Sequence, residues 1–144
     1  MRPTIDELPN LIGLFKEFYN EIDPNFKPPY DMDIEHLEIV IPMMLEHEGF
    51  VIHYREGGVI LGFAAVHPLW PTLKLCSQEL FYVSKAKRGG MLGTRLLKDF
   101  EASGKALGCN MLTVSASSGI NSDATKRFYN HHGYSYRGTT FSKD

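Results

Sequence analysis

The N-terminal part of the chain carries apolar side chains at helical spacing. A first helix is predicted over residues 5–22, where apolar residues recur with gaps of three and four. Thr4, followed three residues later by Glu7, fits the capping box that starts a helix. A second helix is predicted from about residue 33 to about residue 47, and Pro42 should kink or shorten it.

The pattern then changes to runs of aliphatic and aromatic residues that are typical of β-strands. Residues 50–55 and 59–67 flank the turn Glu56-Gly57-Gly58 and predict a hairpin. Residues 73–83 predict a third strand that is rich in aliphatic and aromatic side chains.

Helices and strands alternate in the rest of the chain. The Gly-rich turn Arg88-Gly89-Gly90-Met91-Leu92-Gly93 opens a helix that ends near Gly108, and residues 111–115 predict a strand. A short helix is predicted over residues 123–132, with Gly133 at its C-terminal end, and residues 134–141 predict one or two closing strands. This order predicts an α/β or α+β fold with helices on both faces of a sheet.

Length and composition are those of one globular domain, residues 1–144. Apolar residues make up 43% of the chain and charged residues 22%, which excludes a disordered or fibrous protein. Two cysteines are too few for a secreted disulfide scaffold. The start of the chain lacks a signal-peptide pattern, and no apolar run approaches the roughly 20 residues of a membrane span. We therefore expect a cytoplasmic protein with no membrane partner.

Charge is divided unevenly along the chain. Residues 1–79 have a net charge of −8 and residues 80–144 a net charge of +6, although the whole chain has −2. The basic half could face an anion and the acidic half a cation. Chance placement of solvated charges is the alternative reading.

The Gly-rich turn between the third strand and the next helix has the features of a phosphate site. Unpaired N–H groups and the dipole at a helix N-terminus favour anions, and glycines let a phosphate approach the backbone. Lys85, Lys87 and Arg88 precede the glycines. The pattern of a P-loop is absent, and G-x-G-x-x-G is incomplete. An ordinary tight turn is the alternative.

Two segments together resemble the hallmarks of the GNAT N-acetyltransferase family. Residues 80–97 look like its acetyl-CoA motif, with Met91 in place of the middle glycine, and residues 121–134 look like its Asn-x-x-Ala-x-x-Phe-Tyr-x-x-x-Gly motif. The resemblance implies a GNAT-like mixed central sheet with helices on both faces. Its first strand would be truncated, because only residues 1–3 precede the first helix cap. That sheet edge would be bare, or paired with a second copy in a homodimer.

The resemblance implies an N-acetyltransferase that moves an acetyl group from acetyl-CoA, its co-substrate, to a primary amine. Transfer would occur by direct attack in a ternary complex, on a small-molecule amine or on a protein lysine or N-terminus. The expected contacts to acetyl-CoA are Phe81, Tyr82, Val83, Lys87, Arg88, Gly89, Gly90, Met91, Leu92, Gly93, Thr94, Asn121 and Tyr129.

Four residues receive chemical roles. By the resemblance, the Val83 N–H would hold the thioester carbonyl and Tyr129 would protonate the leaving thiolate. Glu79 is the first candidate for the base that deprotonates the amine, since partial burial in the strand would make its carboxylate a better base. His53 is the second candidate. A packing role for Tyr129 and a solvent-facing or ion-paired role for Glu79 are the alternatives.

Acidic residues in the first half favour a cationic acceptor. They are Glu35, Glu38, Glu46, Glu48 and Glu56. The six histidines have no metal-ligand spacing with the cysteines, so no metal is expected, and Cys76 and Cys109 are expected to be core thiols.

Two other functions remain open at this stage. One is a GNAT-fold binding or regulatory protein with weak or no catalysis. The other is a nucleic-acid-associated protein that uses Lys85, Lys87, Arg88, Arg95 and Lys98, against which the net charge of −2 argues.

Overall fold

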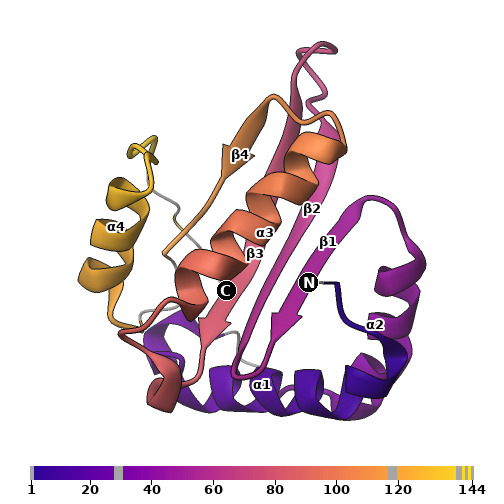
Figure 1. Cartoon of the computed structure of the whole chain (residues 1–144), viewed down its shortest axis with the longest axis vertical. Coiled ribbons are helices and arrows are strands. Elements are labelled where there is room, and N and C mark those ends of the chain that lie inside the picture. Colours follow the sequence, from indigo (N-terminus) through magenta and orange to yellow (C-terminus); the bar gives the residue numbers. More distant parts are fainter. Residues whose placement is uncertain (1, 28–30, 117–119, 139–140, 142, 144) are drawn as a thin grey trace.

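A mixed four-stranded sheet organises the described part of the chain (Figure 1). The computed structural model describes residues 2–27, 31–116, 120–138, 141 and 143. The sheet has the order β1-β2-β3-β4. Strand β2 is antiparallel to both of its neighbours, β1 and β3, and β4 is parallel to β3. The strands are β1 (Phe50–Arg55), β2 (Gly58–Val66), β3 (Lys74–Val83) and β4 (Met111–Thr113).

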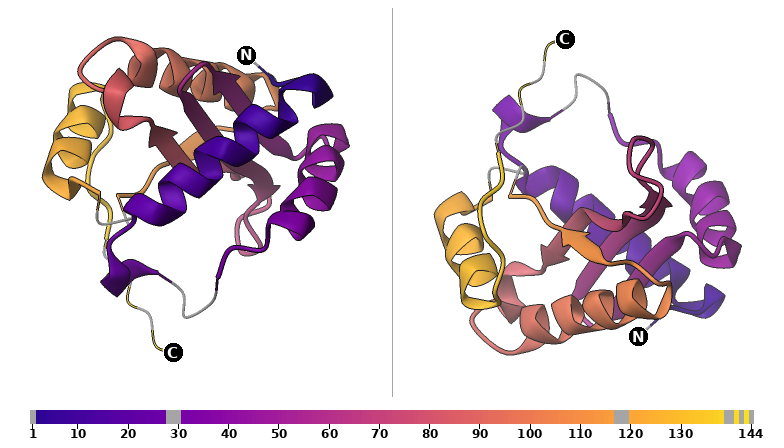
Figure 2. Two further views of the ribbon diagram at one scale, coloured as in Figure 1. Left: turned by 90° about the horizontal axis from the view of Figure 1, so that it is seen from below. Right: turned by 90° about the horizontal axis from the view of Figure 1, so that it is seen from above.

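Helices cover both faces of this sheet, as predicted. The first two, α1 (Leu8–Glu21) and α2 (Ile34–Glu46), lie on one face, and α3 (Leu92–Ala106) lies on the other (Figure 2). The last helix, α4 (Ser122–His131), lies beyond β4 (Figure 1). Among the described residues, a 3₁₀ helix precedes each of α1, α2 and α3: η1 (Ile5–Glu7), η2 (Pro24–Phe26) and η3 (Lys85–Lys87).

The strands carry two hydrophobic cores because their side chains alternate between the faces. Ile52 of β1, Val59 of β2 and Tyr82 of β3 face the core of α1 and α2. The core under α3 is formed by Val51, Ile60, Ala64, Cys76, Leu96, Leu97 and Phe100. Cys76 is completely buried, and this burial raises the pKa of its thiol to about 11. Cys76 is thus a core thiol as expected, whereas Cys109 is half-buried.

The start of the first helix is confirmed, and the effect of Pro42 is not. The Glu7 carboxylate accepts a hydrogen bond of 3.0 Å from the Thr4 N–H, the capping-box contact. Beyond Pro42, α2 continues to Glu46, so Pro42 does not shorten the helix, and a kink at Pro42 stays a prediction. Burial of the α2 face around Ile41, which is 1% exposed, stabilises the helix despite the missing N–H.

The predicted closing strand is also wrong for the residues that the structure describes. Residues 134–138 form no strand, and residues 139–140 lie outside the described part. Tyr134 is held by its N–H to the Tyr129 carbonyl and by its hydroxyl to Glu101. These contacts tie the chain to α4 and α3, and residues 135–138 remain exposed at the surface.

Strand β1 is an edge of the sheet, at the place where the resemblance predicted a truncated first strand. The Arg2 side chain contacts this edge. Within the described residues no strand precedes Phe50. The Arg2 guanidinium donates to the carbonyl of Phe50 at 3.0 Å and to the carbonyls of Met44 and Leu45 at the end of α2. Arg2 therefore links the end of α2 to the edge strand. Pairing of this edge with a second copy stays a prediction.

The described helices include none that is both long and apolar enough to cross a membrane.

Gly62 allows the close approach of α3 to the sheet and gives a test of the packing. A Cβ at this position would lie 2.6 Å from Cε2 of Phe100 and 2.7 Å from the carbonyl oxygen of Ser77. We expect Gly62→Ala to lower the free energy of unfolding by about 1–3 kcal/mol, because backbone and ring must both shift. Gly13→Ala is the control, since a Cβ there meets nothing within 4 Å. Urea denaturation measures both, and equal stability of the two variants would contradict this packing.

Candidate active site

The strands β3 and β4 separate halfway along β3. They pair from Leu75 opposite Met111 to Ser77 opposite Thr113, where the described pairing ends. A β-bulge lies at the same place on the other side of β3. Gln78 is opposite Gly62 and Leu80 is opposite Leu61, which leaves Glu79 as the extra residue. The second half of β3 thus keeps β2 on one edge and loses β4 on the other.

Some backbone N–H groups on this half of β3 point toward the edge that is no longer paired with β4. The Ser84 N–H donates to the Gly57 carbonyl at 2.7 Å, so Ser84 faces β2. Successive residues of a strand direct their N–H groups to opposite edges. The N–H groups of Val83 and Phe81 therefore point away from β2, in the direction of α4 (Figure 1).

Gln78 joins the three segments that meet where β3 and β4 separate. Its side chain is only 8% exposed, and its Oε1 accepts from the Ser115 N–H at 2.9 Å and from the Tyr129 hydroxyl at 3.3 Å. The Tyr129 hydroxyl is also 3.3 Å from the Ser115 carbonyl oxygen. Sequence reasoning missed Gln78, although an amide in the middle of an apolar strand was a usable signal.

Tyr129 is a buried phenol at this junction. Its residue is 6% exposed, and burial raises its pKa further above the ordinary value of 10.0. The phenol therefore keeps its proton at neutral pH, as a general acid must.

The two base candidates lie in different places. Glu79 is exposed at the bulge, so the expectation of a partly buried carboxylate is wrong: the extra residue of a bulge leaves the regular alternation. His53 lies on β1, with β2 between it and β3, and its Nε2 is 2.6 Å from the Ser103 hydroxyl of α3. Glu79 directly follows Gln78, whose side chain contacts Tyr129, whereas His53 lies on the far side of β2.

The Gly-rich turn ends in the exposed N-terminus of α3. Gly89 has φ +88°, a conformation that side chains rarely adopt, and a Cβ at Gly89 or Gly90 would meet nothing within 4 Å. Met91 is the N-cap and makes no side-chain cap, so the first N–H groups of α3 keep their capacity to bind an anion. Gly93 lies 3.6 Å, measured from an added Cβ, from the rings of both Phe81 and Phe128.

Arg88 is paired within the protein rather than extended into solvent. Its Nη1 and Nη2 donate to the Glu21 carboxylate at 2.6 and 2.8 Å, and its Nε donates to the Val83 carbonyl at 2.9 Å. The hydrogen bond from Arg88 lowers the pKa of Glu21, and burial opposes this effect. Sequence reasoning missed Glu21, because nothing in the pattern of α1 marks its last turn as a partner of this turn.

Three other predicted contacts have definite positions. The Tyr82 ring packs in the α1 core, 5.8 Å from the Phe18 ring, and its hydroxyl donates to Glu21 at 2.8 Å. The stem of Lys87 lies against Gly57 in the β1–β2 turn. Asn121 is the N-cap of α4 in the left-handed conformation, φ 45°, and its side chain makes no capping hydrogen bond.

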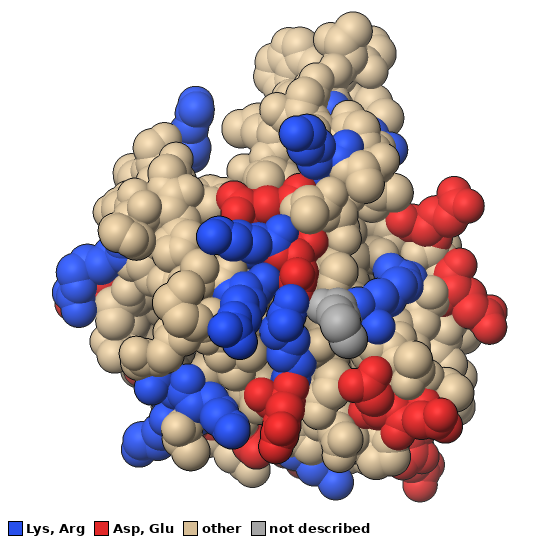
Figure 3. All heavy atoms as spheres, viewed as in Figure 1, with Lys and Arg blue, Asp and Glu red and all other residues tan. Residues whose placement is uncertain are grey.

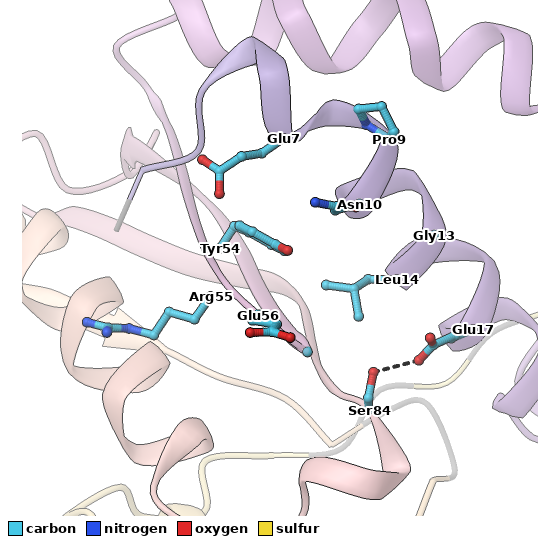
Figure 4. A pocket seen from close by; sticks show the side chains of 11 residues that line it. Glu7, Pro9, Asn10, Gly13, Leu14, Glu17, Tyr54, Arg55, Glu56 and Ser84 are labelled. Atoms are coloured by element: carbon cyan, nitrogen blue, oxygen red, sulfur yellow. Dashed lines mark hydrogen bonds between the residues drawn. The ribbon is translucent and has the colours of Figure 1, made fainter.

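A pocket of about 780 Å³ lies between α1 and the β1–β2 turn (Figure 4). Glu7, Glu17 and Glu56 contribute carboxylates to its lining, and Glu17 accepts a hydrogen bond of 2.6 Å from Ser84. Arg55 lines it too, but its side chain turns away to Asp99 of α3 at 2.9 Å (Figure 4). The lining therefore favours a positive charge.

Basic and acidic side chains are unevenly distributed over the surface, although the two kinds meet in the middle of the face drawn in Figure 3. On the face shown in Figure 3, basic side chains lie over η3, α3 and α4, and acidic side chains gather around α2. The described residues contain no group of three or more His, Cys, Asp or Glu suited to a metal ion.

The chain belongs to the GNAT family of acetyltransferases, because the sequence model of the acetyltransferase (GNAT) family matches residues 14–134. A search of curated proteins found no significant match. The family assignment confirms the resemblance of the two motifs, and it makes an acetyltransferase the class of protein that this fold and site define.

Solved structures share the fold over the full chain. Glucosamine-6-phosphate N-acetyltransferase from Arabidopsis thaliana is 16% identical, with a TM-score of 0.75 over 100% of this chain and 95% of that one. An aminoglycoside acetyltransferase from an uncultured soil metagenomic sample is 17% identical, with a TM-score of 0.72 over 99% and 94%. A transcriptional regulator from Bacillus halodurans is 13% identical, with a TM-score of 0.78 over 100% and 97%. At these identities the likeness shows the fold alone.

Gln78 gives a test of how the junction is held. We expect Gln78→Met to lower the free energy of unfolding by about 1–3 kcal/mol, because the Ser115 N–H loses its acceptor and the Tyr129 hydroxyl loses one of its two. Glu79→Gln, at the exposed neighbouring position, should change it by less than about 0.5 kcal/mol. Urea denaturation distinguishes them, and a harmless Gln78→Met would mean that the junction does not depend on this amide.

Proposed function

We propose that this protein is an acetyl-CoA-dependent N-acetyltransferase that acts on a primary amine by direct attack in a ternary complex. The observation that carries the proposal is the separation of β3 from β4 beside the exposed N-terminus of α3. The separation leaves N–H groups of β3 without a strand partner, and the N–H groups at the N-terminus of α3 lie at one end of this open edge. This arrangement suits a long ligand with a phosphate group at one end.

The pyrophosphate of the donor would bind the turn from Gly89 to Thr94, and the pantetheine arm would follow the free edge of β3. Val83 adjoins the turn, and Glu79 lies four residues away, about 13 Å along a strand. The amine that Glu79 deprotonates must lie beside the thioester carbon, so a thioester carbonyl held at Val83 would be too far from that amine. We therefore assign the Val83 N–H to the pantetheine arm and the Phe81 N–H, nearer the bulge, to the thioester carbonyl.

In this proposal Glu79 accepts a proton from the amine, and the amine nitrogen attacks the thioester carbon. The Phe81 N–H stabilises the oxyanion of the tetrahedral intermediate. The carbon–sulfur bond then breaks as the carbonyl re-forms, and the Tyr129 hydroxyl donates its proton to the departing thiolate. The nitrogen loses its second proton on becoming an amide, and this proton returns to the Tyr129 phenolate through solvent. The proximity of Glu79 and Tyr129 to the junction at Gln78 supports these roles.

The acceptor would be cationic. The carboxylates of the pocket beside α1 and the acidic side chains around α2 support this choice, since they raise the local concentration of a positively charged amine. A small polycationic amine and a lysine side chain both have this chemistry.

Binding of the donor is tested by thermal unfolding with and without acetyl-CoA. A ligand at 100 times its Kd adds about 2.7 kcal/mol to the free energy of unfolding, so we expect Tm to rise by roughly 5–11 °C for a chain of this size. ATP, which shares the adenosine and phosphates, is the control and should give a much smaller shift. No shift at millimolar acetyl-CoA would contradict the proposal.

The catalytic roles are tested by Glu79→Gln and Tyr129→Phe. Each should lower kcat by about 10²–10⁴-fold, the contribution of a positioned acid or base, while the Kd for acetyl-CoA stays within a few-fold. Acetylated product from a panel of amines is quantified by mass spectrometry. Asp6→Asn, an exposed carboxylate on η1, is the matched control. Turnover that survives both substitutions would remove these residues from the mechanism, and donor binding without any turnover would favour a binding or regulatory protein.

A further inference from the structure

The Arg88 side chain makes three hydrogen bonds that link the Gly-rich turn to α1 and to the end of β3. Its guanidinium makes a two-pronged ion pair with Glu21, a third hydrogen bond to the Val83 carbonyl, and a contact 5.5 Å from the centre of the Tyr82 ring. Tyr82 also donates to Glu21, so the carboxylate is held on two sides. These groups connect the last turn of α1 with the end of β3.

The same fork of N–H groups that binds a carboxylate binds a phosphate, because both anions present two oxygens at matching separation. Arg88 immediately precedes Gly89 and the N-terminus of α3. An anion that arrives at this turn therefore finds its guanidinium already occupied by Glu21. The pair is also partly open to solvent, with side-chain exposures of 34% and 28%, so exchange of one anion for another does not require unfolding.

We propose that Glu21 and the pyrophosphate of the donor compete for Arg88, so that donor binding breaks the Glu21–Arg88 pair and releases the last turn of α1. The inference rests on the proposed function, since it takes acetyl-CoA as the donor. Glu21 is then a residue that sets donor affinity without touching the reacting atoms.

Released from Arg88, Glu21 keeps its hydrogen bond from Tyr82, and α1 keeps the Ser84–Glu17 contact one turn earlier. The change is therefore confined to the end of α1, which leads into the segment before α2.

The competition is tested by calorimetric titration of acetyl-CoA into four proteins: the wild type, Glu21→Gln, Arg88→Gln and the double variant. Glu21→Gln should tighten the Kd by about three- to tenfold, the size expected for removing a partly exposed ion pair. Arg88→Gln should weaken it. Adding Glu21→Gln to Arg88→Gln should not change the Kd further, because the guanidinium for which Glu21 and the pyrophosphate compete is absent.

Glu17→Gln is the matched control, because it removes the same charge one helical turn away and its hydrogen bond goes to Ser84 rather than to Arg88. Its Kd should stay within twofold of the wild type. An equal gain from Glu17→Gln would mean that net charge alone acts. An unchanged or weaker Kd for Glu21→Gln, or a gain that persists without Arg88, would overturn the inference and leave the proposed function standing. Absence of binding in every protein would overturn the proposed function and the inference with it.

Hydrogen exchange on the wild type gives a reading that does not depend on how the variants fold. The Ile22 N–H donates to the Phe18 carbonyl at 2.9 Å and closes the last turn of α1. Saturation with acetyl-CoA should speed exchange of this amide severalfold, while exchange in the rest of α1 stays constant or slows. Slower exchange at Ile22 would show that the pair remains intact in the complex.

Discussion

One edge of β3 is hydrogen-bonded to a neighbouring strand along its whole length and the other edge along only part of it. The rest of the structure depends on this difference. The backbone of β3 is paired with β2 along the whole strand, but with β4 only as far as Ser77. The open half remains a strand because both of its faces are packed, with Leu80 and Tyr82 against α1 and Phe81 and Val83 against the α3 side. An extended backbone with outward N–H groups is thereby held in place without a neighbouring strand to pair with.

Local signals made much of this fold predictable. Helical spacing, the Thr4 capping box and the Glu56-Gly57 turn each act over a few residues, and the structure confirms α1 and the hairpin they indicate. The closing strand was wrong because Tyr134 is hydrogen-bonded to α4 and α3, while residues 135–138 are exposed at the surface and form no strand. Gln78 and Glu21 escaped prediction because their roles depend on partners 37 to 67 residues away.

The charge division along the sequence is partly cancelled in three dimensions. Of the two described ion pairs, Glu21 with Arg88 joins an anion of the acidic half to a cation of the basic half, whereas Arg55 with Asp99 pairs the minority charge of each half. The Gly-rich turn is consequently less positive than its three preceding basic residues suggest. Its backbone N–H groups and Lys85 and Lys87 are left as the groups that first meet an anion, which is a weaker attraction than composition alone would imply.

The burial of Cys76 affects how the release of free coenzyme A can be measured. A thiol with a pKa of about 11 and no exposed surface is almost entirely protonated and shielded near pH 8. A thiol-reactive dye that reports free coenzyme A would therefore find only Cys109, which is half-buried, as a reactive group on the folded protein. The background of a continuous colorimetric assay should be at most one thiol per chain, and a rise above one would itself report unfolding.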